Sequence, residues 1–301
     1  MDRPLDTFEA LQARGQAAFE LGHLDESAQL LSEALAWAQV QGDQRRIDLA
    51  FCNLSSVDLS RNPFATIGPE TMNRLREILM RNEDAVNCRL AAYNLARAYE
   101  FRKEARKGLF YARIALDRSQ QLGREDWIAS SHNQIGNFLM AQSFFEEAAH
   151  EYDCALASHP QAADRQAMIL INVGYSRLVR GDHVGGIRLL YSSLRELRRL
   201  GVRRGQMFAH IDLCFAHLEL ERFADAIRHG AKGLALAEEI GEEDAIKNAL
   251  YLLGEARHLS GDDASARELF DRLERDFYPD KTGISEFLLA IDVRKMINLR
   301  A

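Results

Sequence analysis

Hydrophobic residues follow helical intervals in several segments of the chain. In residues 284–297 the apolar side chains form one face, and charged side chains lie opposite them. Residues 45–61 contain a similar apolar series. The five prolines, at positions 4, 63, 69, 160 and 279, leave long segments in which no proline interrupts a helix. The pattern predicts a mostly helical chain.

Pairs of small residues recur with a period of about 40 residues. Each pair is separated by 12 positions, and two helices joined by a short turn pack closely only where small side chains meet. The pairs are Gly15/Ser27, Ala96/Gly108, Gly136/Ala148, Gly174/Gly186, Cys214/Ala226 and Gly254/Ala266. A turn glycine often follows the first member, as at Gly22, Gly181 and Gly261. These pairs predict a series of helical hairpins.

This pattern resembles the tetratricopeptide repeat, a helix–turn–helix unit with small residues at fixed positions. Most of one unit is reproduced by Ile135, Gly136, Tyr152, Ala155 and Pro160. The period exceeds the usual value of about 34 residues, and in this it resembles the arrays of bacterial regulators and kinesin light chains. The resemblance covers nearly the whole chain.

The resemblance implies an all-α fold, a right-handed α-solenoid of about seven hairpins in a single domain, 1–301. A helix at 283–300 is expected to cap the last hairpin, because a stack leaves its final inner face uncovered. The expected units are 5–42, 43–84, 85–123, 124–160, 162–201, 203–241 and 242–279.

The second unit departs from the pattern. Residues 62–69 contain two prolines and separate a first helix from a shortened second helix at 70–82. Repeat arrays tolerate longer loops of this kind. Alternatively, the loop presents Phe64 and Ile67 to a partner.

The composition excludes several classes of protein. The 301 residues carry 38 Lys+Arg and 45 Asp+Glu, a net charge of -7, which argues against nucleic acid as a partner. No apolar run is long enough to span a membrane, and the N-terminus lacks the apolar stretch of a signal peptide. Four widely spaced cysteines predict reduced thiols in a cytoplasmic protein.

No motif for catalysis or for a cofactor is present. The chain lacks a phosphate-binding glycine loop, a GxSxG elbow and an HExxH pair. His210, Cys214 and His217 share a helix face at a spacing that could bind zinc. Because Cys214 is also the small packing residue of its unit, we interpret the group as a core cysteine flanked by two half-exposed histidines. The expectation is a non-enzymatic protein without cofactor or metal.

The resemblance implies that the first helices line a concave groove that binds a peptide or protein segment. One position of this groove carries a ladder of polar side chains, Asn94, Gln134, Asn172 and Asp212, with Asn53 at the approximate place in the second unit. The ladder either bonds the main chain of a peptide or bonds neighbouring helices. The groove residues are Tyr93, Asn94, Arg97, Asn133, Gln134, Asn137, Asn172, Tyr175, Asp212, Phe215 and Tyr251.

An arginine cluster spans the end of one helix and the start of the next. Cations near a helix C-terminus interact favourably with its dipole, which is a structural explanation. The functional alternative is an anion patch for phosphate or for an acidic partner. The residues are Arg195, Arg198, Arg199, Arg203 and Arg204.

These observations predict a protein- or peptide-binding scaffold that works through its groove. The alternative is a peptide- or ligand-gated regulator. The bacterial regulators that this pattern resembles carry an added N-terminal helical or DNA-binding segment. Here the first repeat begins near residue 5, so we expect any regulation to act through a separate effector protein. Self-association through the segment 283–301 is left open.

Overall fold

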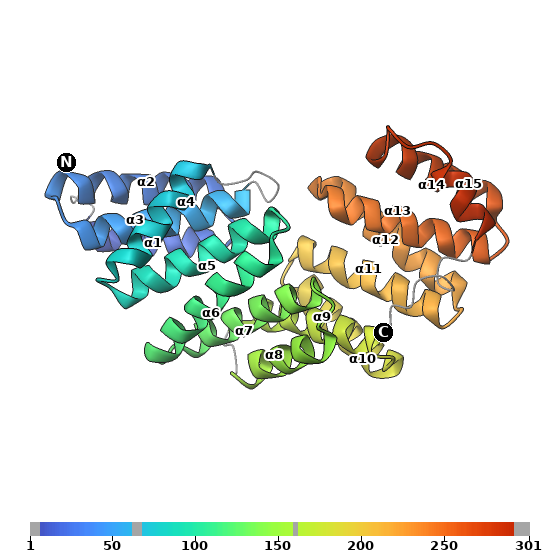
Figure 1. The fold of residues 1–301 in the computed structure, drawn as a ribbon, viewed down its shortest axis with the longest axis horizontal. Helices are drawn as coiled ribbons and strands as arrows, with labels where there is room; N and C mark the ends of the chain where they lie inside the picture. The colour runs from blue at the N-terminus through green and yellow to red at the C-terminus, as the bar shows by residue number, and fades with distance from the viewer. Residues whose placement is uncertain (1–6, 62–67, 159–161, 292–301) are drawn as a thin grey trace. The chain divides into compact units, whose positions relative to one another are not determined.

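The computed structural model describes residues 7–61, 68–158 and 162–291 (Figure 1). Within these residues the chain forms fifteen helices in consecutive packed pairs and no strand. The predicted all-α fold of tetratricopeptide-like hairpins is confirmed. None of the described helices is long and apolar enough to cross a bilayer.

The chain divides by its contacts into two compact units, Met1–Phe144 and Phe145–Ala301. The predicted single domain stays a prediction, and each unit is described by itself. The helices of the first unit are α1 (Phe8–Glu20), α2 (Leu24–Gln41), α3 (Gln44–Arg61), α4 (Pro69–Arg81), α5 (Ala85–Phe101), α6 (Ala105–Gln121) and α7 (Glu125–Met140). Those of the second unit are α8 (Phe145–Ala157), α9 (Ala163–Val179), α10 (His183–Arg199), α11 (Arg203–Glu219), α12 (Phe223–Ile240), α13 (Glu243–Leu259), α14 (Asp263–Phe277) and α15 (Ile284–Ala290).

Small residues meet where the helices of a hairpin cross. A Cβ atom added to Gly186 on α10 would lie 2.8 Å from the carbonyl oxygen of Gly174 on α9, so no larger residue fits at this crossing. In the α1–α2 hairpin the hydroxyl of Ser27 donates a 2.8 Å hydrogen bond to the carbonyl oxygen of Gly15. The close packing predicted for the Gly174/Gly186 and Gly15/Ser27 pairs is confirmed.

The turn after each of these first helices contains one residue in the left-handed region. Glycines occupy this place at Gly22, Gly181 and Gly261, with φ angles of 80°, 88° and 90°. The equivalent position is held by Lys103, Ser143 and Glu221, with φ angles of 57°, 63° and 56°. The repeat therefore requires this backbone conformation even where the sequence offers no glycine to signal it.

The second hairpin is open. α4 makes few contacts with α3 and packs instead against α5. Its apolar side chains Met72, Leu75 and Ile78 join a core cluster with Cys52 of α3 and Leu95 of α5. Phe64 and Ile67, the proposed contact residues, lie outside the described part of the chain.

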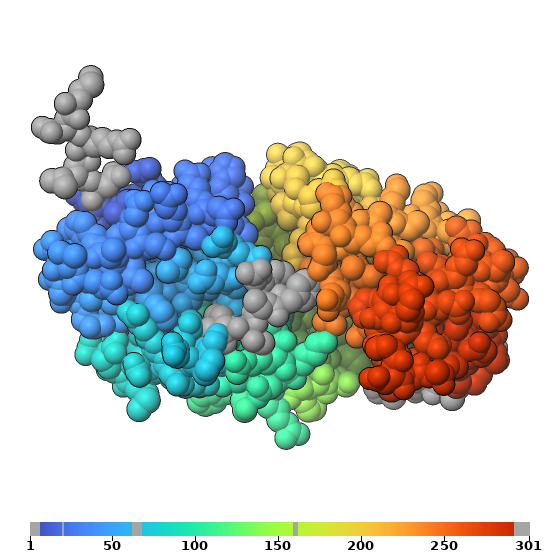
Figure 2. Space-filling model, turned by 90° about the horizontal axis from the view of Figure 1, so that it is seen from above, coloured from blue at the N-terminus to red at the C-terminus, as the bar shows by residue number. Residues whose placement is uncertain are grey.

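The C-terminal unit ends in a short helix. α15 packs against α14, and Leu288 joins the core cluster that contains Phe270 and Leu273. Both helices are red in Figure 2, where they cover this end of the unit. α15 ends at Ala290 because Ile291 is extended, with φ -135° and ψ 128°. The remainder of the predicted cap, from residue 292, lies outside the described residues.

The turn geometry predicts that Glu221→Gly stabilises the protein. The side chain of Glu221 is exposed, and a residue other than glycine in the left-handed region costs about 1 kcal/mol. The substitution should therefore raise the free energy of unfolding by about that amount, as measured by urea denaturation. Gly181→Ala is the matched control: nothing lies within 4 Å of the added Cβ, so its expected destabilisation reports the backbone alone. Equal midpoints for both variants would contradict the prediction.

Candidate functional site

The first helices of three consecutive hairpins in the second unit enclose a cavity of about 640 Å³. These helices are α9, α11 and α13, and α11 contacts both of the others. All lining residues lie on them, apart from the residue that caps α13 at its N-terminus. The lining residues are Tyr175, Phe208, Ile211, Asp212, Phe215, Leu218, Glu219, Glu242, Asp244, Ala245, Asn248, Tyr251 and Leu252.

The helical repeat of α11 explains why this wall combines aromatic rings with the carboxylate of Asp212. Phe208, Asp212 and Phe215 are spaced by four and three residues, so they lie on one face of the helix. From α9, the ring of Tyr175 lies 6.2 Å from the ring of Phe215, with the planes tilted by 54°. Tyr251 of α13 completes the aromatic lining. The cavity therefore has an apolar surface around Asp212, and a second carboxylate of α11, Glu219, also lines it.

Asp212 has a carboxylate with no compensating partner. It enters none of the hydrogen bonds or ion pairs among the described residues. Burial raises the pKa of Asp212 to about 8. Burial, with the Asp212 carboxylate second, raises the pKa of Tyr175 to about 12, so the phenol stays protonated. A charge here opposes folding and would be stabilised by a ligand that carries a cation.

The remaining charges of the cavity are also acidic. Glu242 is tied to Arg204 by two hydrogen bonds of 2.7 and 2.8 Å, and Asp244 lies 3.6 Å from Lys247. No lysine, arginine or histidine is among the residues that line the described cavity. Aromatic faces and carboxylates together favour a cation with an apolar neighbour, such as a lysine or arginine side chain of a peptide.

Four of the predicted groove residues meet in this cavity: Tyr175, Asp212, Phe215 and Tyr251. Asn172 is half-buried on α9 and is not among the lining residues. The sequence prediction omitted Phe208 and Asn248. Their signal was present, because Phe208 precedes Asp212 by four residues and Asn248 precedes Tyr251 by three on the same helix faces.

In the first unit the polar ladder bonds neighbouring helices. The Asn53 amide donates to the Gln12 side-chain oxygen at 2.7 Å. Asn94 is fully buried; its amide donates to the carbonyl oxygen of Cys52 at 2.7 Å, and its oxygen accepts from Ser56 at 2.7 Å. At positions 53 and 94, hydrogen bonding between neighbouring helices therefore explains the asparagine.

The other predicted groove residues of the first unit are mostly engaged within it. Arg97 donates to the carbonyl oxygen of Ser56 at 3.3 Å and to the Ser60 hydroxyl at 3.2 Å. The guanidinium of Arg89 lies 4.5 Å from the Tyr93 ring centroid. Asn133 and Asn137 are half-buried, whereas Gln134 is 4% exposed, and its side-chain oxygen has no hydrogen-bond partner among the described residues. Their role in binding stays a prediction.

Most arginines of the predicted anion patch have partners within the protein. Arg199 pairs with Glu196 through bonds of 3.0 and 3.2 Å, and Arg203 pairs with Glu239. Arg204 pairs with Glu242, as described above, and Arg198 bonds a histidine. Arg195 is exposed. These carboxylates neutralise much of the patch, and an anion would have to compete with them.

Three histidines of this unit, His210, His217 and His229, form a buried hydrogen-bonded chain. Arg198 can only donate, so its 3.1 Å contact with His210 Nε2 makes that atom an acceptor. His210 Nδ1 then donates to His229 Nδ1 at 2.9 Å. His229 Nε2 donates to the Tyr191 hydroxyl at 3.1 Å, and the hydroxyl donates to His217 Nε2 at 3.2 Å. In this arrangement each imidazole ring has one nitrogen that accepts a hydrogen bond and so carries no proton, and all three histidines are therefore neutral.

Sequence spacing alone groups Cys214 with two of these histidines and does not reveal His229. The prediction that His210 and His217 are half-exposed is wrong, because packing against α10 and α12 buries both. The structure turns Cys214 toward α12, where its Sγ would lie 2.9 Å from a Cβ added to Gly230. Cys214 is fully buried, and its predicted role as a packing residue is confirmed. Within residues 7–61, 68–158 and 162–291, no three His, Cys, Asp or Glu side chains are placed to hold a metal ion.

Sequence comparison gives limited information. No protein-family model matches the chain. The Outer dynein arm-docking complex subunit 4 of Danio rerio is 28% identical over 183 residues. The match covers 55% of this chain and 37% of the zebrafish protein, so the chain spans well under half of that relative's length.

Solved structures show the same fold at low identity. The apo form of the quorum sensor NprR from B. thuringiensis has a TM-score of 0.67 and 13% identity, over 96% of this chain and 81% of that one. A Rap protein complexed with Competence and Sporulation Factor has a TM-score of 0.59 and 15% identity, over 100% and 88% of the two chains. These similarities establish the tetratricopeptide-like architecture.

The histidine chain predicts that stability falls with acidification. Burial is the main cause that lowers the pKa of His210 to about 4 and of His229 to about 3. The unfolded chain binds protons from about pH 6.5 downward, so the folded state should lose stability between about pH 6.5 and 4. We expect a loss of about 1 kcal/mol or more, measured by urea denaturation across this range.

His229→Gln should flatten this pH dependence, because it removes one of the groups that titrate. His150→Gln is the control, since His150 is exposed and lies outside the chain of bonds. A slope that is not reduced in His229→Gln, or that is reduced equally in His150→Gln, would rule out the buried histidines as its source.

Proposed function

We propose that the protein is a non-enzymatic adaptor that binds a peptide or protein segment in the α9–α11–α13 cavity. The segment carries a lysine or arginine side chain beside an apolar residue. The observation that carries the proposal is the uncompensated carboxylate of Asp212 in an aromatic cavity. A group that opposes folding and has no hydrogen-bond or ion-pair partner among the described residues is well explained by a partner outside the protein.

The lining supports this chemistry at each point of contact. Asp212 would pair with the cationic head of the ligand, and Tyr175 and Phe215 would flank its aliphatic stem. Phe208 and Leu252 offer apolar surface to the neighbouring residue of the segment. The volume of about 640 Å³ suits one or two side chains rather than a folded domain.

A ligand-gated regulator is the second candidate. The cavity is built from three hairpins, so a ligand that contacts all three can change their packing. A quorum sensor and a Rap protein in complex with a factor have similar folds, which supports this reading. A bound peptide that alters the X-ray scattering profile would favour the regulator, which would then act on a separate effector protein. An unchanged profile would favour the adaptor.

The proposal predicts a charge preference in a peptide selection. A displayed library of random hexapeptides should enrich lysine or arginine next to Leu, Phe or another apolar residue. With Asp212→Asn as bait, the basic preference should disappear, and the affinity of the selected peptides should fall by about tenfold or more. Asp271→Asn is the matched control, because Asp271 is an exposed carboxylate on α14 away from the cavity. Selection of peptides without a preference for lysine or arginine, or an unchanged basic preference with Asp212→Asn, would refute the proposal.

Loss of binding in Asp212→Asn should not reflect unfolding. The pKa of Asp212 is raised, so its charge destabilises the folded state progressively from about pH 4 up to about pH 8. The asparagine variant should be more stable than the wild type at pH 8, by about 1–3 kcal/mol, and no more stable at pH 4. A variant that binds less while it is more stable separates function from folding.

A further inference from the structure

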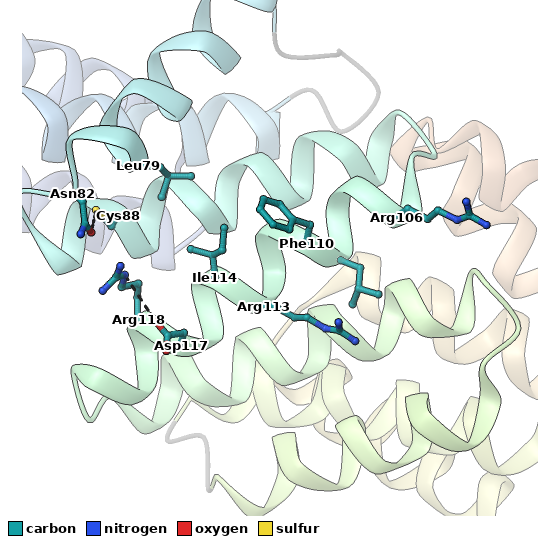
Figure 3. Close-up of a pocket in the computed structure, with 10 residues that line it drawn as sticks. Leu79, Asn82, Cys88, Arg106, Phe110, Arg113, Ile114, Asp117 and Arg118 are labelled. Atoms are coloured by element: carbon teal, nitrogen blue, oxygen red, sulfur yellow. Dashed lines mark hydrogen bonds and ion pairs between the residues drawn. The ribbon is translucent and has the colours of Figure 1, made fainter.

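The outer side of the first unit contains a second hollow, of about 710 Å³, between the end of α4 and the exposed face of α6 (Figure 3). It exists because α4 is only 13 residues long and packs on α5, whereas α6 has 17 residues. In Figure 3 the side chains of Leu79, Phe110 and Ile114 gather around this hollow. Phe110 is 60% exposed, a large apolar ring that the unit itself does not cover.

Arginines border the apolar floor. Arg106 and Arg113 are exposed, and neither has a hydrogen bond or an ion pair among the described residues. Arg118 lies at the other end of the hollow, where its Nε is 4.0 Å from the Asp117 carboxylate. Asp117 is the single acidic residue among those that line the hollow. The rim is therefore net positive on a chain whose net charge is -7.

The spacing of these groups fits a helix. Arg106 and Arg113 lie seven residues apart on α6, about 10 Å along its axis. Phe110 lies between them on the same face. A partner helix that packs alongside α6 would meet both guanidinium groups with carboxylates seven residues apart, and would place apolar side chains from the intervening turn over Phe110.

We infer that this hollow, defined by Leu79, Phe110, Ile114, Arg106 and Arg113, docks an acidic amphipathic helix of another protein. Charge complementarity selects the partner, because the rim offers unpaired cations and the floor offers apolar surface. The site lies in the first unit and does not depend on the cavity of the second unit. With both sites, the protein would connect two partners of opposite charge.

The test uses a helix-stapled synthetic peptide of 16 residues, with glutamates seven positions apart and two leucines between them. A matched peptide carries glutamines in place of the glutamates. Fluorescence anisotropy with the full chain should show saturable binding of the acidic peptide, weakened about tenfold or more by Arg106→Glu together with Arg113→Glu. Phe110→Ala should weaken both peptides by a similar factor, since it removes apolar contact.

Arg228→Glu with Lys232→Glu is the control, because these exposed cations lie one helical turn apart on α12 in the second unit, outside both proposed sites. It should leave binding unchanged. Absence of binding by the acidic peptide, or an equal loss in the control variant, would overturn the proposal. Sedimentation of the chain alone adds a further arm: a dimer that Phe110→Ala dissociates would identify a second copy as the occupant and would also overturn it.

Discussion

The structure depends on the close approach of paired helices at small side chains. At the crossing of α9 and α10, a methyl group on Gly186 would collide with the carbonyl oxygen of Gly174, so the backbones themselves are in contact. This contact fixes where each hairpin crosses and which helix faces remain for its neighbours. The placement of α9, α11 and α13, and thus the faces that build the cavity, follows from it.

Positions that are equivalent in the repeat have different physical roles. The asparagines at positions 53 and 94 stabilise the array, because they satisfy buried polar groups of adjacent helices. At the same place in α11, Asp212 has no such partner among the described residues and faces a cavity. Repetition therefore supplies a scaffold, and the proposed binding sites lie where one unit breaks the local pattern. The short α4 is a second break, and it leaves Phe110 of α6 exposed.

The candidate site was only partly predictable. Tyr175, Asp212, Phe215 and Tyr251 follow from position in the repeat, and Phe208 could have followed from the helical period of α11. The uncompensated charge of Asp212 could not, because the absence of a partner depends on every side chain packed around it. Likewise, His229 joins His210 and His217 only through the packing of α12 on α11.

The sequence by itself determined the helical hairpins, their period and the small residues at their crossings, because each of these is a local pattern repeated many times. It also indicated turns at Gly22, Gly181 and Gly261. Only the tertiary structure showed that Lys103, Ser143 and Glu221 adopt left-handed backbone conformations and that Asn53 and Asn94 bond neighbouring helices in the first unit. It also showed that Asp212 has no hydrogen-bond or ion-pair partner among the described residues. The reason is physical: periodicity reports which face a residue occupies, whereas desolvation and pairing depend on neighbours that lie about 40 residues away in the sequence.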